Sequence, residues 1–365
     1  MERRFTGKGE RRVPSPIRLG GGSRRILVKV ALDAMGGDYA PEEAVKGALQ
    51  ASRELGVEVV LVGDRARLEE ELAKHTIGNL PVSIHPASQV VPMDEHHPAD
   101  AMRKYRDSSI LVATDLVSKG LACAVVSAGN TGASMASALL RLKRIEGVDR
   151  PAIATVMPTT SGFCLIVDAG ANVDCKPFHL LSFAVMGSVY AERALGLKEP
   201  RVGLLNIGEE ESKGNELVVK AYPLLKESGL NFIGNVEGKD IPHGAADVVI
   251  CDGFVGNVVL KLAEGLGSAI VGMIKAEIAS NFLARLGGLL MLPALGRLKK
   301  KMDYQEYGGA LLLGVRGLCV IAHGRSRSKA IKNAIRVAKD AFVGGVIPHI
   351  EKGIRDRIVQ GSVKC

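Results

Sequence analysis

Short apolar runs alternate with glycine-containing loops and helical patterns along most of this chain. The runs at 26–32, 122–127 and 202–207 lead into DAMGGD, AGNTG and GEEESKGNE, and a helical pattern follows each loop. Continuous Val, Ile and Leu runs of this length are typical of parallel strands that helices cover on both faces. The pattern therefore predicts an α/β fold built around a mostly parallel sheet.

The N-terminal segment differs from the rest of the chain in composition. Residues 1–25 hold eight Arg or Lys and two Glu, so they carry +6 of the formal net charge of +9. We expect 1–24 to be a disordered basic arm, either an anchor for anionic lipid or nucleic acid or a solvated tail. Residues 25–365 show no internal repeat or linker, which predicts a single domain.

Cysteine and histidine usage argues against a metal centre. None of the six cysteines forms a CxxC pair, four lie in or beside apolar runs, and the eight histidines show no ligand spacing with them. Such cysteines usually act as small core residues in a reducing compartment. The glycine loops match neither a P-loop nor G-x-G-x-x-G followed by an acidic residue. We therefore expect a cytoplasmic protein that needs no metal or diffusible cofactor.

Six loops are candidates for chemistry. They are DAMGGD (33–38), SAGNTG (127–132), DAGANVD (168–174), GEEESKGNE (208–216), CDGFVGN (251–257) and AHGRS (322–326). Glycine allows the backbone to approach a ligand closely, and loops at helix N-termini present amide groups to an anion. Because ligands bind beyond the carboxyl ends of parallel strands, we expect all six loops to form one anion-binding crevice.

Two polar residues in these loops are candidates for catalysis. Lys213 is a lone cation after Glu209–Glu211. It is either a surface lysine on a solvated turn or a cation that these carboxylates orient toward a developing oxyanion. Asn257 is either a helix N-cap or a donor aimed at a carbonyl oxygen. Since the chain lacks a G-x-S-x-G motif and an activated-thiol motif, direct attack by a bound nucleophile is favoured over a covalent enzyme intermediate.

Residues 280–302 interrupt the alternation of strands and helices. The longest charge-free run, Leu286–Gly296, has eleven residues and basic flanks, and it is too short to span a bilayer. An apolar hairpin with a basic rim fits partial burial in a membrane interface, and it equally fits a helical pair packed on a subunit partner. Pro293 is expected to break or kink any helix in this segment.

These motifs together resemble the PlsX family of fatty acyl–acyl carrier protein:phosphate acyltransferases. Matching segments cover roughly 26–345 in order, and they include VALDAMGGDYAPE, SAGNTGA, GVDRPAIATVMPT, VDAGANVDCKP, PRVGLLNIGEEESKGNEL and DVVICDGFVGN. The resemblance implies transfer of a long-chain acyl group from an acyl carrier protein thioester to inorganic phosphate. The product, acyl phosphate, would feed phospholipid synthesis through a downstream glycerol-3-phosphate acyltransferase.

The resemblance also implies an architecture and a set of site residues. The fold would be the three-layer α/β/α architecture of the isocitrate and isopropylmalate dehydrogenases, in a homodimer attached peripherally to the inner face of the membrane. Residues proposed as catalytic in the family fall on Lys213 and Asn257. Phosphate or thioester binding is expected at Asp33, Gly36, Gly37, Gly129, Asn130, Thr131, Gly132, Asn172, Asp252, Gly253 and His323. Membrane contact is expected at Phe282, Leu286, Leu289, Leu290, Leu292, Lys299 and Lys300.

Two alternative functions remain open at this point. A phosphate acetyl- or butyryltransferase acting on coenzyme A thioesters would use the same chemistry with a shorter acyl chain. A non-enzymatic membrane or nucleic-acid adaptor would rely on the basic arm. Of the net charge of +9, +6 lies in residues 1–25, so only +3 remains for the rest; aromatic residues make up 4% and tryptophan is absent. This composition argues against a nucleic-acid partner.

Overall fold

The computed structural model describes residues 28–280, 282–302 and 307–359, so the predicted arm at 1–24 lies outside the described residues. Eleven strands form one sheet in the order β3-β2-β1-β4-β11-β10-β5-β6-β9-β7-β8. The strands are β1 (Lys29–Asp33), β2 (Glu58–Gly63), β3 (Val82–Pro86), β4 (Ala124–Ser127), β5 (Ala152–Thr159), β6 (Gly162–Val167), β7 (Val202–Asn206), β8 (Phe232–Glu237), β9 (Val248–Ile250), β10 (Ala310–Leu313) and β11 (Leu318–Ile321).

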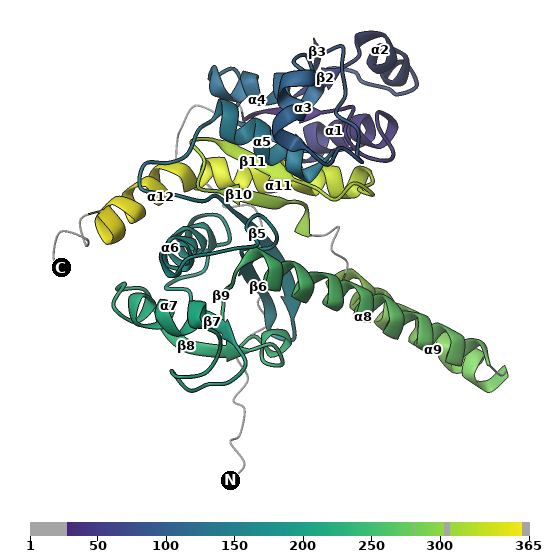
Figure 1. Cartoon of the computed structure of the whole chain (residues 1–365). Coiled ribbons are helices and arrows are strands. Elements are labelled where there is room, and N and C mark those ends of the chain that lie inside the picture. Colours follow the sequence, from purple (N-terminus) through teal and green to yellow (C-terminus); the bar gives the residue numbers. More distant parts are fainter. Residues whose placement is uncertain (1–27, 281, 303–306, 360–365) are drawn as a thin grey trace, which may run out of the picture.

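Helices cover both faces of this sheet (Figure 1). They are α1 (Glu42–Leu55), α2 (Arg65–Ala73), α3 (Pro98–Lys104), α4 (Ser109–Ser118), α5 (Thr131–Arg141), α6 (Pro177–Arg193), α7 (Glu216–Lys226), α8 (Gly253–Ala279), α9 (Phe282–Met302), α11 (Ser328–Val343) and α12 (Val346–Ile354). The α1, α6 and α11 helices share one apolar core, and α4 and α5 contribute to a second. The three-layer α/β/α class with a mostly parallel sheet is therefore confirmed.

The direction of the strands reverses near the middle of the sheet. The strands β1 to β4 and β11 run parallel to one another, whereas β10 is antiparallel to both β11 and β5. The β6 strand is antiparallel to β5, and β9, β7 and β8 run parallel to β6. The carboxyl ends of β1, β4 and β11 thus lie at one end of the sheet, and those of β6, β7 and β9 lie at the opposite end.

This reversal corrects the expected position of the glycine loops. Three of them, 33–38, 127–132 and 322–326, follow β1, β4 and β11, and the other three follow β6, β7 and β9. The expectation that all six share one crevice is wrong, because it assumed that the strands before them all run in one direction. We refer to the two groups as the β1/β4/β11 end and the β6/β7/β9 end.

The α8 and α9 helices form an arm that projects from the body of the protein (Figure 1). A Cβ atom placed on Gly288 would lie 2.5 Å from Ile278 Cγ2, so α9 packs back against α8. Pro293 lies within α9 and does not end it, so the expected break is absent. The α8 helix, Gly253–Ala279, is long and apolar enough to cross a membrane by length and composition alone. The arm is therefore larger than the segment 280–302 that the sequence indicated.

The arm leaves many apolar side chains in contact with solvent. On α9, four of the predicted membrane-contact residues are exposed: Phe282, Leu286, Leu289 and Leu290. The side chains of Leu292, Lys299 and Lys300 lie outside the described residues. On α8, Val258, Leu262, Leu266 and Ile270 are exposed at a spacing of four residues, which places them along one side of the helix. Both helices thus present an apolar surface that the body of the protein does not cover.

A buried carboxylate, Asp168, fixes the structure where β6 ends. Its Oδ1 accepts from the backbone N–H of Ile153 at 2.9 Å and of Ala171 at 3.0 Å, and its Oδ2 accepts from the N–H of Asn172 at 2.8 Å. The Asn172 side chain donates a further bond to Oδ2 at 2.8 Å. Burial raises the pKa of Asp168, and these donors oppose that rise. The carboxylate thereby ties β5 to the loop after β6.

We predict that Asp168→Asn lowers the free energy of unfolding by about 2–4 kcal/mol, because the new amide group would face backbone N–H donors that need an acceptor. The measurement is urea denaturation followed by circular dichroism. Asp174→Asn is the matched control: this aspartate is exposed in the same loop, and its replacement should change stability by less than about 0.5 kcal/mol. Equal unfolding midpoints for the two variants would contradict the role assigned to Asp168.

Candidate active site

At the β1/β4/β11 end, polar groups of the protein hold the glycine loops against one another. The Ser127 hydroxyl donates to Asp33 Oδ2 at 2.7 Å, and the Gly129 N–H donates to Ser127 Oγ at 3.0 Å. Burial raises the pKa of Asp33, and hydrogen bonds from Ser109 and Ser127 oppose that rise. A Cβ atom on Gly36 would lie 2.5 Å from Asp33 Oδ2. Asp33, Gly36 and Gly129 therefore come together as predicted, around a small cavity between the loops.

The Asn130 side chain makes hydrogen bonds that stabilise the structure of this end. Its Oδ1 accepts from the Ala133 N–H at 2.9 Å, which caps α5, and its Nδ2 donates to the carbonyl oxygens of Met93 and Glu95, both at 3.0 Å. The side chain thus positions the segment before α3. These contacts occupy the amide that the sequence suggested for ligand binding.

The remaining predicted residues of this end lie around the same loops. Thr131 and Gly132 are the first residues of α5. Gly37, at φ 104°, packs beside Ala128. His323 is exposed after β11, and its Nδ1 accepts from the Arg325 N–H at 3.1 Å.

At the β6/β7/β9 end, the start of α8 packs against the loop that Asp168 organises. The Asp252 side chain caps α8 by accepting from the Val255 N–H at 2.8 Å. The Gly253 N–H donates to the Asn172 carbonyl oxygen at 2.7 Å, and a Cβ atom on Gly256 would lie 1.9 Å from the Asp168 carbonyl oxygen. Glycine is required at 253 and 256 because the backbone of the protein itself occupies the space of a side chain.

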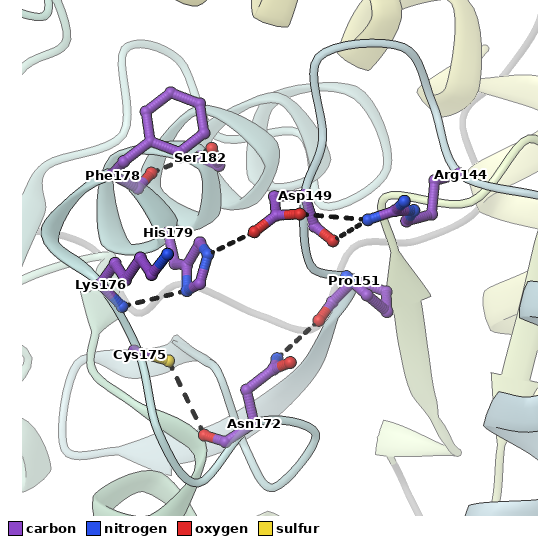
Figure 2. A network of polar contacts seen from close by, with 9 residues as sticks. All are labelled: Arg144, Asp149, Pro151, Asn172, Cys175, Lys176, Phe178, His179 and Ser182. Carbon is purple, nitrogen blue, oxygen red and sulfur yellow. Dashed lines mark hydrogen bonds and ion pairs between the residues drawn. The ribbon is translucent and has the colours of Figure 1, made fainter.

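Asn257 lies in the first turns of α8 with an exposed side chain. Because Asp252 is the N-cap, the alternative that Asn257 caps the helix is wrong. A Cβ atom on Gly170 would lie 3.6 Å from Asn257 Cγ, so the asparagine stands directly beside the loop after β6. Asn172 is buried instead, and its amide donates to the Pro151 carbonyl oxygen at 2.7 Å (Figure 2). At this end, the Asn257 side chain is exposed, whereas the buried Asn172 side chain makes hydrogen bonds within the protein.

Lys213 is exposed in the loop after β7. Asn206 at the end of β7 donates to the Lys213 carbonyl oxygen at 2.9 Å, which fixes the backbone of the loop. Glu211 pairs with Lys226 at 2.9 Å, and this contact lowers the pKa of Glu211. Within the described part of the chain, Lys213 makes no ion pair. The expectation that Glu211 orients Lys213 is therefore wrong, and the ammonium group faces solvent.

A histidine that no sequence motif indicated supports this end. His179, in the first turn of α6, is buried; its Nδ1 accepts from the Lys176 N–H at 3.0 Å and its Nε2 lies 2.8 Å from Asp149 Oδ2 (Figure 2). The hydrogen bond to His179 lowers the pKa of Asp149. The acceptor role of Nδ1 assigns the proton to Nε2, which donates to the carboxylate. In the sequence, Asp149 stands just before a strand and His179 stands just after a glycine loop. These positions were the signal that could have indicated the pair.

The thiols near the site are poor nucleophiles. Burial, with the nearby carboxylates of Asp168 and Asp252, raises the pKa of Cys175 to about 12. Burial also raises the pKa of Cys164 and Cys319 to about 12. Among the described residues, no group of three or more His, Cys, Asp or Glu side chains is arranged to hold a metal ion.

Comparison with solved structures gives the fold but not the chemistry. A phosphotransacetylase from Streptococcus pyogenes matches with a TM-score of 0.59 at 17% identity, covering 87% of this chain and 94% of that one. The EutD phosphotransacetylase from Staphylococcus aureus matches with a TM-score of 0.56 at 19% identity, covering 86% and 94%. At this level of identity, the likeness establishes a shared architecture only.

Comparison of sequences finds relatives with much higher identity to this chain. A family model described as "Fatty acid synthesis protein" matches residues 28–348. The phosphate acyltransferase of Desulforamulus reducens is 55% identical over 330 residues, which is 90% of this chain and 98% of that protein. The phosphate acyltransferase of Geobacter sulfurreducens is 51% identical over 333 residues, covering 91% and 94%. With matches of this extent to enzymes of one name, the chain belongs to the phosphate acyltransferase family, whose members transfer an acyl group to phosphate.

Proposed function

We propose that this enzyme transfers a long-chain fatty acyl group from acyl carrier protein to inorganic phosphate, and that the transfer takes place at the β6/β7/β9 end. The supporting observation is the placement of Asn257. Its side chain is exposed beside Gly170, while the polar groups around it are already committed to hydrogen bonds within the protein. A carboxamide donor of this kind suits an oxyanion that forms only during reaction.

The reaction needs no covalent enzyme intermediate. A phosphate oxygen attacks the thioester carbonyl carbon and forms the new C–O bond. The tetrahedral oxyanion then collapses, the C–S bond breaks, and the carrier thiol leaves with the proton of hydrogen phosphate. Asn257 donates to the oxyanion, and the Lys213 ammonium holds the negative charge of phosphate. Positioning and electrostatic stabilisation supply the rate enhancement.

The alternative donor is a short-chain coenzyme A thioester. The phosphotransacetylase neighbours share the architecture, yet their identity to this chain is below 20%. The exposed apolar arm favours a donor with a long acyl chain, because its product is itself apolar. We propose that the enzyme is a homodimer that attaches peripherally to the membrane, and that its arm contacts the inner face of the membrane. The enzyme would then deliver acyl phosphate to a downstream glycerol-3-phosphate acyltransferase.

The test of this function is release of free carrier protein from palmitoyl-acyl carrier protein, measured with and without inorganic phosphate and with no added metal. We expect release to require phosphate and to yield palmitoyl phosphate in equal amount. Release without phosphate would identify a thioesterase. Activity confined to acetyl- or butyryl-coenzyme A would establish the alternative donor.

We predict that Lys213→Ala and Asn257→Ala each lower kcat about 10²–10³-fold, in line with the loss of one donor that stabilises an oxyanion. The melting temperature should stay within a few degrees of that of the parent protein, because both side chains are exposed. Lys220→Ala is the control, since this lysine on α7 pairs with Glu216, one turn earlier on the same exposed helix surface. Near-normal turnover in Lys213→Ala or Asn257→Ala would remove that residue from the mechanism.

We predict that iodoacetamide at pH 8 leaves the enzyme active, because a thiol whose pKa is about 12 is almost entirely protonated at that pH. Mass spectrometry should find Cys175 unmodified in the folded protein and modified after denaturation. The variant Cys175→Ser should retain activity. Inactivation that follows modification of Cys175 would instead point to a covalent acyl-enzyme.

A further inference from the structure

Four exposed cations flank the β6/β7/β9 end and have no role in the proposed chemistry. They are Lys143, Arg150, Lys176 and Arg316, and we call them the basic ridge. They come from three segments: the loop between α5 and β5, the turn between β10 and β11, and the loop between β6 and α6. These segments are separated in the sequence and lie next to one another in the fold.

Backbone contacts join the first two segments. The Arg316 N–H donates to the Lys143 carbonyl oxygen at 3.0 Å, and the Ile145 N–H donates to the Gly314 carbonyl oxygen at 3.0 Å. Arg144 and Val315 form an isolated antiparallel bridge between these two bonds. The ladder holds Lys143 and Arg316 next to each other at the surface.

Side-chain contacts join this pair of segments to the third (Figure 2). His179 bonds Asp149 at 2.8 Å and accepts from the Lys176 N–H, which places Lys176 close to the loop that carries Arg150. Arg150 also lies close enough to Cys175 to influence its thiol electrostatically. The three segments that carry the four cations are therefore held together by direct contacts.

The same contacts connect the ridge to the candidate catalytic residue. Asn172 donates to the Pro151 carbonyl oxygen, directly after Arg150, and accepts from the Gly253 N–H at 2.7 Å at the start of α8. Asn257 follows on the same helix, beside Gly170. The loop that carries Arg150 is thus connected, through Asn172, to the start of the helix that carries Asn257.

Carboxylates lie in the same loops as the ridge: Arg150 is close enough to Asp149 to help lower the pKa of that carboxyl, and Glu146 and Asp174 are exposed. Among the described residues, none of the four cations forms an ion pair. The neighbouring Asp149 is occupied by Arg144, at 3.2 Å, and by His179. Exposed cations that make no ion pair within the protein favour a negatively charged partner.

We propose that the basic ridge is the docking surface for an acidic carrier protein that presents the acyl thioester to Asn257. The inference rests on the proposed function, because it assumes a donor carried by a protein. A carrier must dock beside the reacting group so that its flexible arm can reach the site. Complementary charge at that position accelerates encounter and fixes orientation.

The experiment compares two donors in the variant Arg150→Glu/Arg316→Glu. One donor is palmitoyl-acyl carrier protein, and the other is the palmitoyl thioester of N-acetylcysteamine, which carries the reacting group without a protein. The control variant Arg53→Glu/Lys198→Glu changes net charge equally at exposed positions on α1 and after α6. The quantity measured is kcat/KM for each donor at saturating phosphate, over a series of salt concentrations.

We expect kcat/KM for the carrier donor to fall at least tenfold in the ridge variant and to lose its salt dependence, with less than a twofold change for the small thioester. The control variant should match the parent protein. Equal loss for both donors would assign the cations to the chemistry and overturn docking, as would unchanged kinetics with the carrier. A parent enzyme that rejects carrier donors and uses only coenzyme A thioesters would overturn the proposed function itself, and the docking surface with it.

Discussion

The candidate active site depends on the buried carboxylate of Asp168. It collects backbone N–H groups from the start of β5 and from the loop after β6, and that loop then receives the first residues of α8 through Asn172. Hydrogen bonds to a buried carboxylate are strong, and a buried carboxylate without donors would destabilise the protein. The loop conformation that gives Asp168 its donors is therefore strongly preferred over conformations that leave the carboxylate without them. The position of Asn257 follows from this constraint, because its helix begins where the loop holds it.

The reversal of strand direction determines which residues can act together. The β10 and β11 strands, from the C-terminal part of the chain, lie between β4 and β5. Because β10 is antiparallel to both of its neighbours, β5 runs in the same direction as β4, and the antiparallel pairing of β5 with β6 then reverses the sheet. The loops at the two ends of the sheet therefore contact different parts of the protein. Asp33, Gly129 and Asn130 organise one end, while Asn257 and the loop of Lys213 lie at the other. A site based on Asn257 leaves the first group outside the immediate reacting centre.

The glycine motifs were located correctly by their sequence, and the structure gives a packing reason for several of them. The sequence suggested that a ligand approaches the backbone at Gly36, Gly253 and Gly256, and in the structure other groups of the protein lie against these glycines. A sequence cannot distinguish an approaching ligand from an approaching segment of the protein, because the space beside a glycine can hold either. Glu211 shows the same limit: it precedes Lys213 by two residues, yet its partner is Lys226 on α7.

The sequence alone determined the α/β class, the strand and loop segments and the family, because apolar runs, glycine loops and ordered motifs are local patterns that each segment carries by itself. Only the tertiary structure decided how those segments combine. Strand direction, the Asp168 contacts, the His179–Asp149 pair and the basic ridge all join residues that are distant in the chain. Such contacts depend on the three-dimensional packing of the whole sheet, and no single segment encodes them.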